Sequence, residues 1–155
     1  MSFRFDEKEF RARAPARLHA SPRDSARFSD DDLNPEARLI PPGVTPRPAA
    51  VLVPLVPRDT GLKLLLTQRT AHLAKHAGQV AFPGGKIDAD DADPVAAALR
   101  ETEEETGIGR SFVEPVGFLD TYLTGTSYRV VPVVAMLRPG FTVTPHAGEV
   151  ADVFE

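Results

Sequence analysis

Residues 93–107 place the strongest constraint on how this chain folds. Asp93 is a favoured N-cap residue, Pro94 suits the first position of a helix, and Gly107 suits the position just beyond its end. The segment at residues 96–99 consists of strong helix formers. The sequence therefore predicts a helix over residues 94–106. One arc of this helix is suited to packing on a sheet, and it contains Val95, Ala98, Leu99, Thr102 and Thr106.

Three glutamates, Glu101, Glu104 and Glu105, are neighbours on another side of the predicted helix, because their spacing is i, i+3 and i+4. Two carboxylates ~5 Å apart repel each other by about 3 kcal/mol at an effective dielectric constant of about 20. A bound cation would remove this cost, and Mg²⁺ is typically held by a few carboxylates, waters and substrate phosphates. On helix spacing alone, a solvated acidic face is an equally good interpretation.

A glycine turn precedes the helix. Pro83-Gly84-Gly85-Lys86 follows residues 80–82, which are predicted to form a short strand. Paired glycines allow positive φ angles and a close approach of the backbone to another group, including a metal or a phosphate. The turn is weak evidence by itself, but together with the acidic helix it favours a site over a solvated surface.

The other apolar segments predict a mixed α and β domain whose sheet is built from non-adjacent strands. Residues 49–56 and 62–68 predict a hairpin with a turn at 58–61. Strands are also predicted over residues 113–123, 128–137 and 141–144. Residues 1–47 are polar, and we expect them to form an arm packed on a domain of residues 48–155. Within the arm, we expect a short helix over residues 6–14 and a loop over residues 29–35.

Composition excludes several classes of protein. The absence of cysteine excludes disulfides, thiolate metal sites and cysteine nucleophiles. The net charge of −4 argues against nucleic acid as a partner. No apolar run is long enough for a membrane helix, and residues 1–13 are too charged for a secretory signal, so we expect a cytoplasmic protein. With only four histidines, a catalytic metal would depend on carboxylates, which favours Mg²⁺ or Mn²⁺.

The glycine turn and the helix together resemble the Nudix box, G-x5-E-x7-R-E-U-x-E-E-x-G-U, in which U is a bulky apolar residue. The matching residues are Gly85, Arg100, Glu101, Glu104, Glu105, Gly107 and Ile108. Three positions differ: Asp91 replaces the first glutamate, eight residues rather than seven separate it from Arg100, and Thr102 stands at an apolar position. The resemblance implies an α/β Nudix fold, in which a mixed β-sheet lies between helices, and a hydrolase that cuts diphosphate linkages with a divalent metal.

Residues 65–85 resemble, more narrowly, the coenzyme A diphosphatases of the Nudix superfamily. The similarity is carried by Leu65-Leu66-Thr67-Gln68-Arg69-Thr70 and by His76-Ala77-Gly78-Gln79-Val80-Ala81-Phe82. It implies hydrolysis of coenzyme A, or a derivative of it, to 4′-phosphopantetheine and adenosine 3′,5′-bisphosphate. The alternatives are a Nudix diphosphatase acting on NADH, ADP-ribose or a nucleoside triphosphate, and a non-catalytic module that binds a nucleotide. The oligomeric state is not predicted.

The resemblance also assigns roles to single residues. It implies that Glu101, Glu104, Glu105 and the carbonyl of Gly84 bind Mg²⁺ or Mn²⁺. The general base is either Glu104 or Glu149, and Arg100 is expected to orient Glu101 by a charge-assisted hydrogen bond.

Substrate contacts are expected from Arg69, His76, Lys86 and Gly85, with Lys75 as a further cation near the substrate. Arg69 is the first choice for the 3′-phosphate of coenzyme A, whereas Tyr122, Tyr128 and Phe141 are expected to pack within the sheet. A Nudix fold normally has a second helix after the Glu149 region, so we expect the chain to be shortened at its C-terminus.

Overall fold

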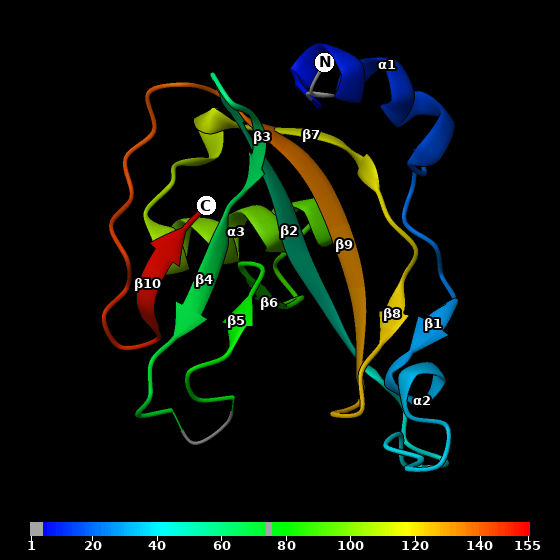
Figure 1. Cartoon of the computed structure of the whole chain (residues 1–155). Coiled ribbons are helices and arrows are strands. Elements are labelled where there is room, and N and C mark those ends of the chain that lie inside the picture. Colours follow the sequence, from blue (N-terminus) through cyan, green and yellow to red (C-terminus); the bar gives the residue numbers. More distant parts are fainter. Residues whose placement is uncertain (1–4, 74–75) are drawn as a thin grey trace.

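The computed structural model describes residues 5–73 and 76–155 (Figure 1). Lys75, a candidate substrate contact, lies outside the described residues. The elements in chain order are α1 (Glu7–Arg17), β1 (Phe28–Ser29), α2 (Asp30–Leu33), β2 (Arg47–Arg58), β3 (Gly61–Leu64), β4 (Leu66–Arg69), β5 (Val80–Ala81), β6 (Gly84–Lys86), α3 (Pro94–Thr106), the 3-10 helix η1 (Arg110–Phe112), β7 (Val113–Phe118), β8 (Tyr122–Leu123), β9 (Tyr128–Leu137) and β10 (Val150–Phe154).

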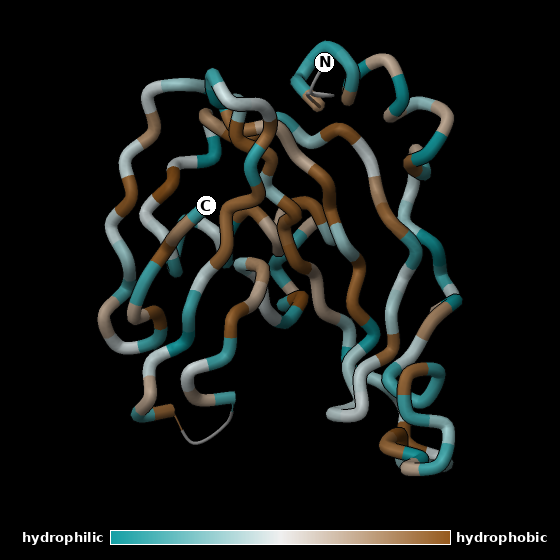
Figure 2. Tube along the Cα trace, in the orientation of Figure 1, coloured by the Kyte–Doolittle hydropathy of each residue, from teal (hydrophilic) through white to brown (hydrophobic). Residues whose placement is uncertain are grey.

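Two long parallel strands, β2 and β9, form the centre of the larger sheet. They pair from Arg47 opposite Tyr128 to Leu55 opposite Met136. Strands buried on both faces are expected to be apolar along their length rather than alternating, and β9 from Val131 onward fits this pattern. Figure 2 shows hydrophobic residues concentrated along these two strands.

On the edge that faces away from the other central strand, β2 and β9 each pair with two shorter strands. On β2, β6 pairs with the N-terminal half and β3 with the C-terminal half. On β9, β8 pairs with the N-terminal half and β7 with the C-terminal half. The pairing of β6 sets the glycine turn directly beside Ala50 and Val51 of β2, which fixes its place in the candidate site.

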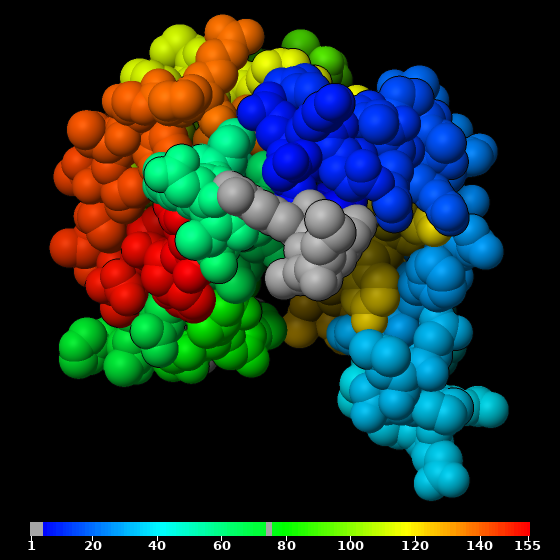
Figure 3. Space-filling model, turned by 45° about the horizontal axis from the view of Figure 1, so that its top comes forward, coloured from blue at the N-terminus to red at the C-terminus, as the bar shows by residue number. Residues whose placement is uncertain are grey.

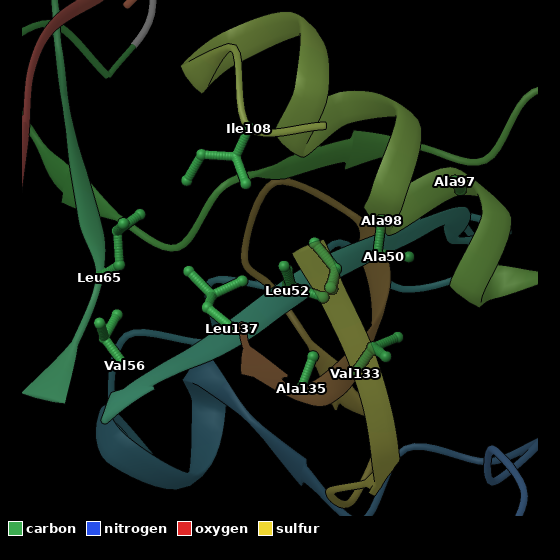
Figure 4. Packing of buried hydrophobic residues seen from close by; sticks show 11 residues of the cluster. Ala50, Leu52, Val56, Leu65, Ala97, Ala98, Ile108, Val133, Ala135 and Leu137 are labelled. Carbon is green, nitrogen blue, oxygen red and sulfur yellow. The ribbon is translucent and has the colours of Figure 1, made fainter. Parts of the chain in front are cut away.

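Helix α3 begins and ends at the cap residues predicted from the sequence. The Asp93 side chain accepts a hydrogen bond from the N–H of Ala96, and Gly107 ends the helix with a left-handed φ of 74°. The helix packs on β2 and β6 (Figure 1). Beneath it, Leu52, Leu137 and Ile108 belong to the buried apolar cluster that Figure 4 shows.

The predicted hairpin is formed by β2 and β3, but its second strand is interrupted after Leu64. The chain continues as β4, which belongs to a second sheet with the order β10-β4-β5. The segment at Val150–Phe154 is a strand that pairs with β4 and brings the residue before it, Glu149, next to Thr70. This second sheet forms the other side of the candidate site.

The N-terminal residues lie along the margin of the larger sheet. Arg11 of α1 forms an ion pair with Glu114 of β7, and His19 forms a backbone bridge with Phe118. Strand β1 pairs with β8 and extends the sheet. Figure 3 shows this segment in blue and cyan on one side, opposite the green and red strands of the second sheet. The division of the chain at residue 47 stays a prediction.

Two expectations from the sequence are wrong. Residues 29–35 are not a loop throughout, because Ser29 pairs with Leu123 of β8 and is the N-cap residue of the short helix α2. Residues 141–144 do not form a strand, since Thr144 instead donates its N–H to the carbonyl of Thr106 at the end of α3.

No helix within the described parts of the chain is long and apolar enough to cross a membrane.

Candidate active site

Arg100 lies at the centre of a hydrogen-bond network between α3 and the glycine turn. Asp91 accepts two hydrogen bonds from its guanidinium, at 3.1 and 2.8 Å, and the carbonyl of Lys86 accepts a third at 3.1 Å. The Arg100 guanidinium holds the pKa of the Asp91 carboxyl below its usual range. Asp91 therefore fixes Arg100, although it stands where the Nudix box has a glutamate.

The same guanidinium donates to the Glu101 carboxylate at 2.9 Å, as expected for a residue that orients Glu101. On its other side this carboxylate lies over Gly85. A β-carbon at Gly85 would be only 2.6 to 2.8 Å from the Glu101 carboxyl atoms, so any larger residue would displace them. Burial raises the pKa of Glu101, and the hydrogen bond from Arg100 opposes this increase.

Glu105 is buried, with only 5% of its surface exposed. Its carboxylate accepts a hydrogen bond from the N–H of Gly84 at 3.2 Å. Burial raises the pKa of Glu105 to about 7, the Gly84 N–H opposes this, and the negative charge of Glu101 adds to it. A carboxylate kept in such a place costs stability unless a cation neutralises it.

The segment from Phe141 to Glu149 closes the far side of the site. It is anchored to the C-terminal end of α3, where the carbonyl of Thr106 accepts the N–H of Thr144 and that of Glu105 accepts the N–H of His146. Such contacts satisfy helix carbonyls that have no partner within the helix. The carbonyl of Glu149 accepts the N–H of Thr70, so Glu149 joins α3 to strand β4.

Glu104 differs from the other two glutamates of the helix. Its side chain is 61% exposed, and the ion pair that it forms with Arg100 is long, at 3.6 Å. Among residues 5–73 and 76–155, no group of three or more His, Cys, Asp or Glu side chains lies close enough together to hold a metal ion. The helix spacing therefore makes the three glutamates neighbours without directing all three to one point.

A cavity of about 340 Å³ opens beside Glu101 and Glu105. Among the predicted site residues it is also lined by Arg69, Gly84, Gly85, Lys86 and Glu149, whereas neither Glu104 nor Arg100 lines it. The remaining lining residues come from the central strands and from the turn before β9: Ala49, Val51, Thr124, Tyr128 and Val130.

A second cavity, of about 750 Å³, adjoins the first, because the two share the lining residues Val51, Arg69, Gly84, Glu105 and Tyr128. The other residues that line it are Arg47, Thr67, His76, Gln79, Ala81, Phe82 and Thr126. The two cavities together are called the groove below. Its lining residues come from β4 and β5 on one side and from the N-terminal parts of β2 and β9 on the other. Figure 1 shows where these strands lie.

A match to the family model for the NUDIX domain covers residues 45–153. The chain belongs to the Nudix family. It is 47% identical over 130 residues to "Uncharacterized Nudix hydrolase NudL" of Shigella flexneri serotype 5b, covering 81% of this chain and 67% of that protein. It is 52% identical over 109 residues to the NudL of Escherichia coli K12, covering 70% of this chain and 56% of that protein. The chain thus spans between about half and two thirds of these relatives.

A solved structure of a C. elegans Ap4A hydrolase binary complex has a TM-score of 0.56 to this chain. The two share 24% of their residues over 68% of this chain and 76% of the other, a similarity that shows the fold alone. The mixed α and β Nudix fold predicted from the sequence is therefore confirmed.

The donor set fits a hard divalent cation at the Nudix box. Glu101 and Glu105 line one cavity, and burial raises the pKa of both. Both offer only oxygen atoms, which are the ligands that Mg²⁺ and Mn²⁺ prefer. Glu104 is exposed, and its only ion pair among the described residues is the long one with Arg100, so the fold does not fix its side chain in one position.

Several residues that line the groove were not singled out by the sequence. Tyr128 was expected to pack within the sheet, yet it lines both cavities, and the Arg47 guanidinium lies 4.3 Å from its ring centre. The amide oxygen of Gln79 accepts a hydrogen bond at 2.9 Å from Nδ1 of His76, and both residues line the second cavity. Arg47 and Tyr128 are brought together by the register of β2 against β9, which could not be predicted from the sequence.

Proposed function

We propose that the chain hydrolyses the diphosphate linkage of coenzyme A or its derivatives, to give 4′-phosphopantetheine and adenosine 3′,5′-bisphosphate. The family, the buried Glu105 and the half-buried Glu101 support a metal-dependent hydrolase acting on nucleoside diphosphate derivatives. One observation carries the finer assignment. Seven residues from the segment that resembles coenzyme A diphosphatases line the second cavity, namely Thr67, Arg69, His76, Gln79, Ala81, Phe82 and Gly84.

Glu101 and Glu105 are the proposed ligands of Mg²⁺ or Mn²⁺, completed by Glu104 and the Gly84 carbonyl. When bound, the ion neutralises the diphosphate and lowers the pKa of a coordinated water. Arg100 and Gly85 hold Glu101 in position from two sides. The Gly84 N–H holds Glu105, so the glycine turn positions both carboxylates before substrate binds.

Arg69 lines both cavities and is proposed to bind the diphosphate, next to the carboxylates. Lys86 and the backbone of Gly85 border the first cavity on the side of Glu101, and His76 borders the second. In the reaction a water oxygen forms a bond to one phosphorus as the bond to the bridging oxygen breaks. The proton of the water passes to a carboxylate, and the leaving phosphate departs as an anion.

Glu149 is the proposed general base. It lines the first cavity beside Glu101 and Glu105, whereas Glu104 does not. Its backbone is anchored by hydrogen bonds to Thr70 on one side and to His146 on the other. A base must come within hydrogen-bond reach of the attacking water, and this placement favours Glu149 over Glu104.

A substrate panel tests the proposal. The purified chain is incubated with Mg²⁺ or Mn²⁺ and with coenzyme A, NADH, ADP-ribose or ATP, and the products are separated by chromatography. We expect adenosine 3′,5′-bisphosphate only when metal is present, and fastest turnover with coenzyme A. Faster cleavage of another substrate would contradict the coenzyme A assignment and keep the metal-dependent hydrolase. No cleavage of any substrate by a folded protein would favour a nucleotide-binding module.

A further inference from the structure

The two ends of the groove differ in charge. The end formed by the first cavity, called the acidic end, carries Glu101, Glu105 and Glu149. The end formed by the part of the second cavity that is not shared, called the basic end, carries Arg47, His76 and Gln79, and none of its described lining residues is a carboxylate. A ligand that extends along the groove therefore meets a metal-binding end and an end suited to a further anion.

Arg47 is held ready for such an anion. It is the first residue of β2 and lies opposite Tyr128 in the parallel pairing with β9. Its guanidinium carbon is 4.3 Å from the centre of the Tyr128 ring, a distance at which the ring face attracts the cation. No ion pair formed among residues 5–73 and 76–155 involves Arg47. A guanidinium stacked in this way keeps its planar set of donors available for a phosphate.

Arg69 is placed differently. It lies where the two cavities meet, and its positive charge acts on the carboxyl of Glu105. Its Nε is buried and has no hydrogen-bond partner among the described residues, which is a costly state for a donor. This position is next to the carboxylates and therefore faces the linkage that is cut, not a group at the far end of the substrate.

We propose that Arg47, stacked on Tyr128, binds a phosphate monoester that the substrate carries away from the cleaved diphosphate. This inference rests on the proposed function, under which that group is the 3′-phosphate of coenzyme A. Thr126 and Gln79 line the same cavity and supply further hydrogen-bonding groups. The sequence favoured Arg69 for the 3′-phosphate, and the geometry assigns Arg69 to the diphosphate instead.

Lys86 is the competing cation. It lines the first cavity, where Glu101, Glu105 and Glu149 also lie. A phosphate monoester bound there would be placed among three carboxylates, in addition to the diphosphate that the same cavity would hold. Like charges in close proximity disfavour this arrangement, so the basic end is the better place for a second phosphate.

Binding of the product tests the inference without turnover. Calorimetry with a chelator present compares adenosine 3′,5′-bisphosphate with adenosine 5′-monophosphate for the wild type, Arg47→Met, Lys86→Met and the control Arg129→Met. Arg129 is the matched control, because its guanidinium donates to the carbonyl of Asp24, outside the groove. We expect the wild type and the control to prefer the bisphosphate about tenfold, and Arg47→Met to lose that preference.

Kinetics then separate this inference from the proposed function. Arg47→Met should lower kcat/KM for coenzyme A about tenfold more than for 3′-dephospho-coenzyme A. Equal losses for both substrates, or a preference for the bisphosphate that is lost only in Lys86→Met, would overturn the inference. If the wild type cleaves neither substrate, the proposed function fails, and the binding comparison still decides whether Arg47 recognises the second phosphate.

Discussion

At the acidic end of the groove the carboxylates of Glu101 and Glu105 are held by other parts of the fold, whereas at the basic end the side chains come from strand ends and a turn. Glu101 is fixed between Arg100 and Gly85, and Glu105 is fixed by the Gly84 N–H. Arg47 and His76 are exposed and are positioned mainly by a ring face and by Gln79. The difference indicates that the acidic end is preorganised, while the residues of the basic end can vary without disturbing the core.

The largest expected effect lies at the acidic end. Glu105→Gln should keep the fold, because the amide oxygen can still accept the Gly84 N–H, and it should lower kcat by on the order of 10³-fold with coenzyme A. The loss is expected because Glu105 is a proposed ligand of the metal, and the amide that replaces it carries no negative charge. Steady-state kinetics with Mg²⁺ measure it, and circular dichroism verifies folding.

Glu103→Gln is the control on the same helix, because Glu103 pairs with Arg110 on the exposed side and lines neither cavity. Its kcat should stay within about twofold of the wild type. Near-normal turnover in Glu105→Gln would remove the acidic end from the reaction. The order of the carboxylates at the acidic end would then have no role in catalysis.

Much of the acidic end could be predicted from the sequence, because it is local. The caps of α3 and the spacing of Glu101 and Glu105 follow from positions within one helix, and the family resemblance implied the Arg100–Glu101 contact. The burial of Glu105 could not be predicted, since it depends on how α3 packs against β6. Helix geometry groups Glu104 with Glu105, but the sheet leaves one exposed and covers the other.

The basic end could be predicted only in part. His76 and Arg69 belong to a recognisable stretch, but Arg47 lies far from it in the sequence and has no motif of its own. It reaches the groove because β2 and β9 pair in parallel, with Arg47 opposite Tyr128. The end of the second predicted hairpin strand was missed for a related reason. After Leu64 the chain stops pairing with β2 and joins a second sheet. This change depends on tertiary contacts, which the local sequence pattern does not predict.

A second expected effect concerns the free energy of unfolding, and it distinguishes the acidic end of the groove from the basic end without any substrate. Burial raises the pKa of Glu105 to about 7, above the ordinary value of 4.5. The folded state therefore holds this proton more tightly than the unfolded state, and stability is lost as the pH rises from about 4.5 to about 7. A tenfold difference in proton affinity between the two states corresponds to about 1.4 kcal/mol, so the loss in metal-free protein approaches about 3 kcal/mol.

Denaturant unfolding at several pH values between 5 and 8, with a chelator present, measures this loss. Glu105→Gln has no carboxyl to ionise, so the wild type should fall relative to this variant as the pH rises. Arg47→Met should keep the wild-type dependence, because Arg47 lies at the other end of the groove. A constant difference between wild type and Glu105→Gln across this range would show that Glu105 ionises without cost.

The smallest effect concerns Asp91, which contacts Arg100 and does not line the groove. Outer carboxylates that orient metal-binding side chains typically contribute 10-fold or more to activity, so Asp91→Asn should lower kcat about tenfold. Because Arg100 then holds Glu101 less firmly, the change should appear in kcat and leave KM for coenzyme A nearly unchanged. This pattern is the opposite of that expected for Arg47→Met.

Two variants make the Asp91 result specific. Asp88 lies 3.3 Å from Arg100 with a side chain that is 63% exposed, so Asp88→Asn should have little effect on kcat. Asp91→Glu restores the residue type of the Nudix box at this position and should recover most of the lost kcat. A rise in KM in place of the fall in kcat would mean that Asp91 acts on substrate binding. The acidic end would then owe its order to the glycine turn alone, and not to the Arg100 network.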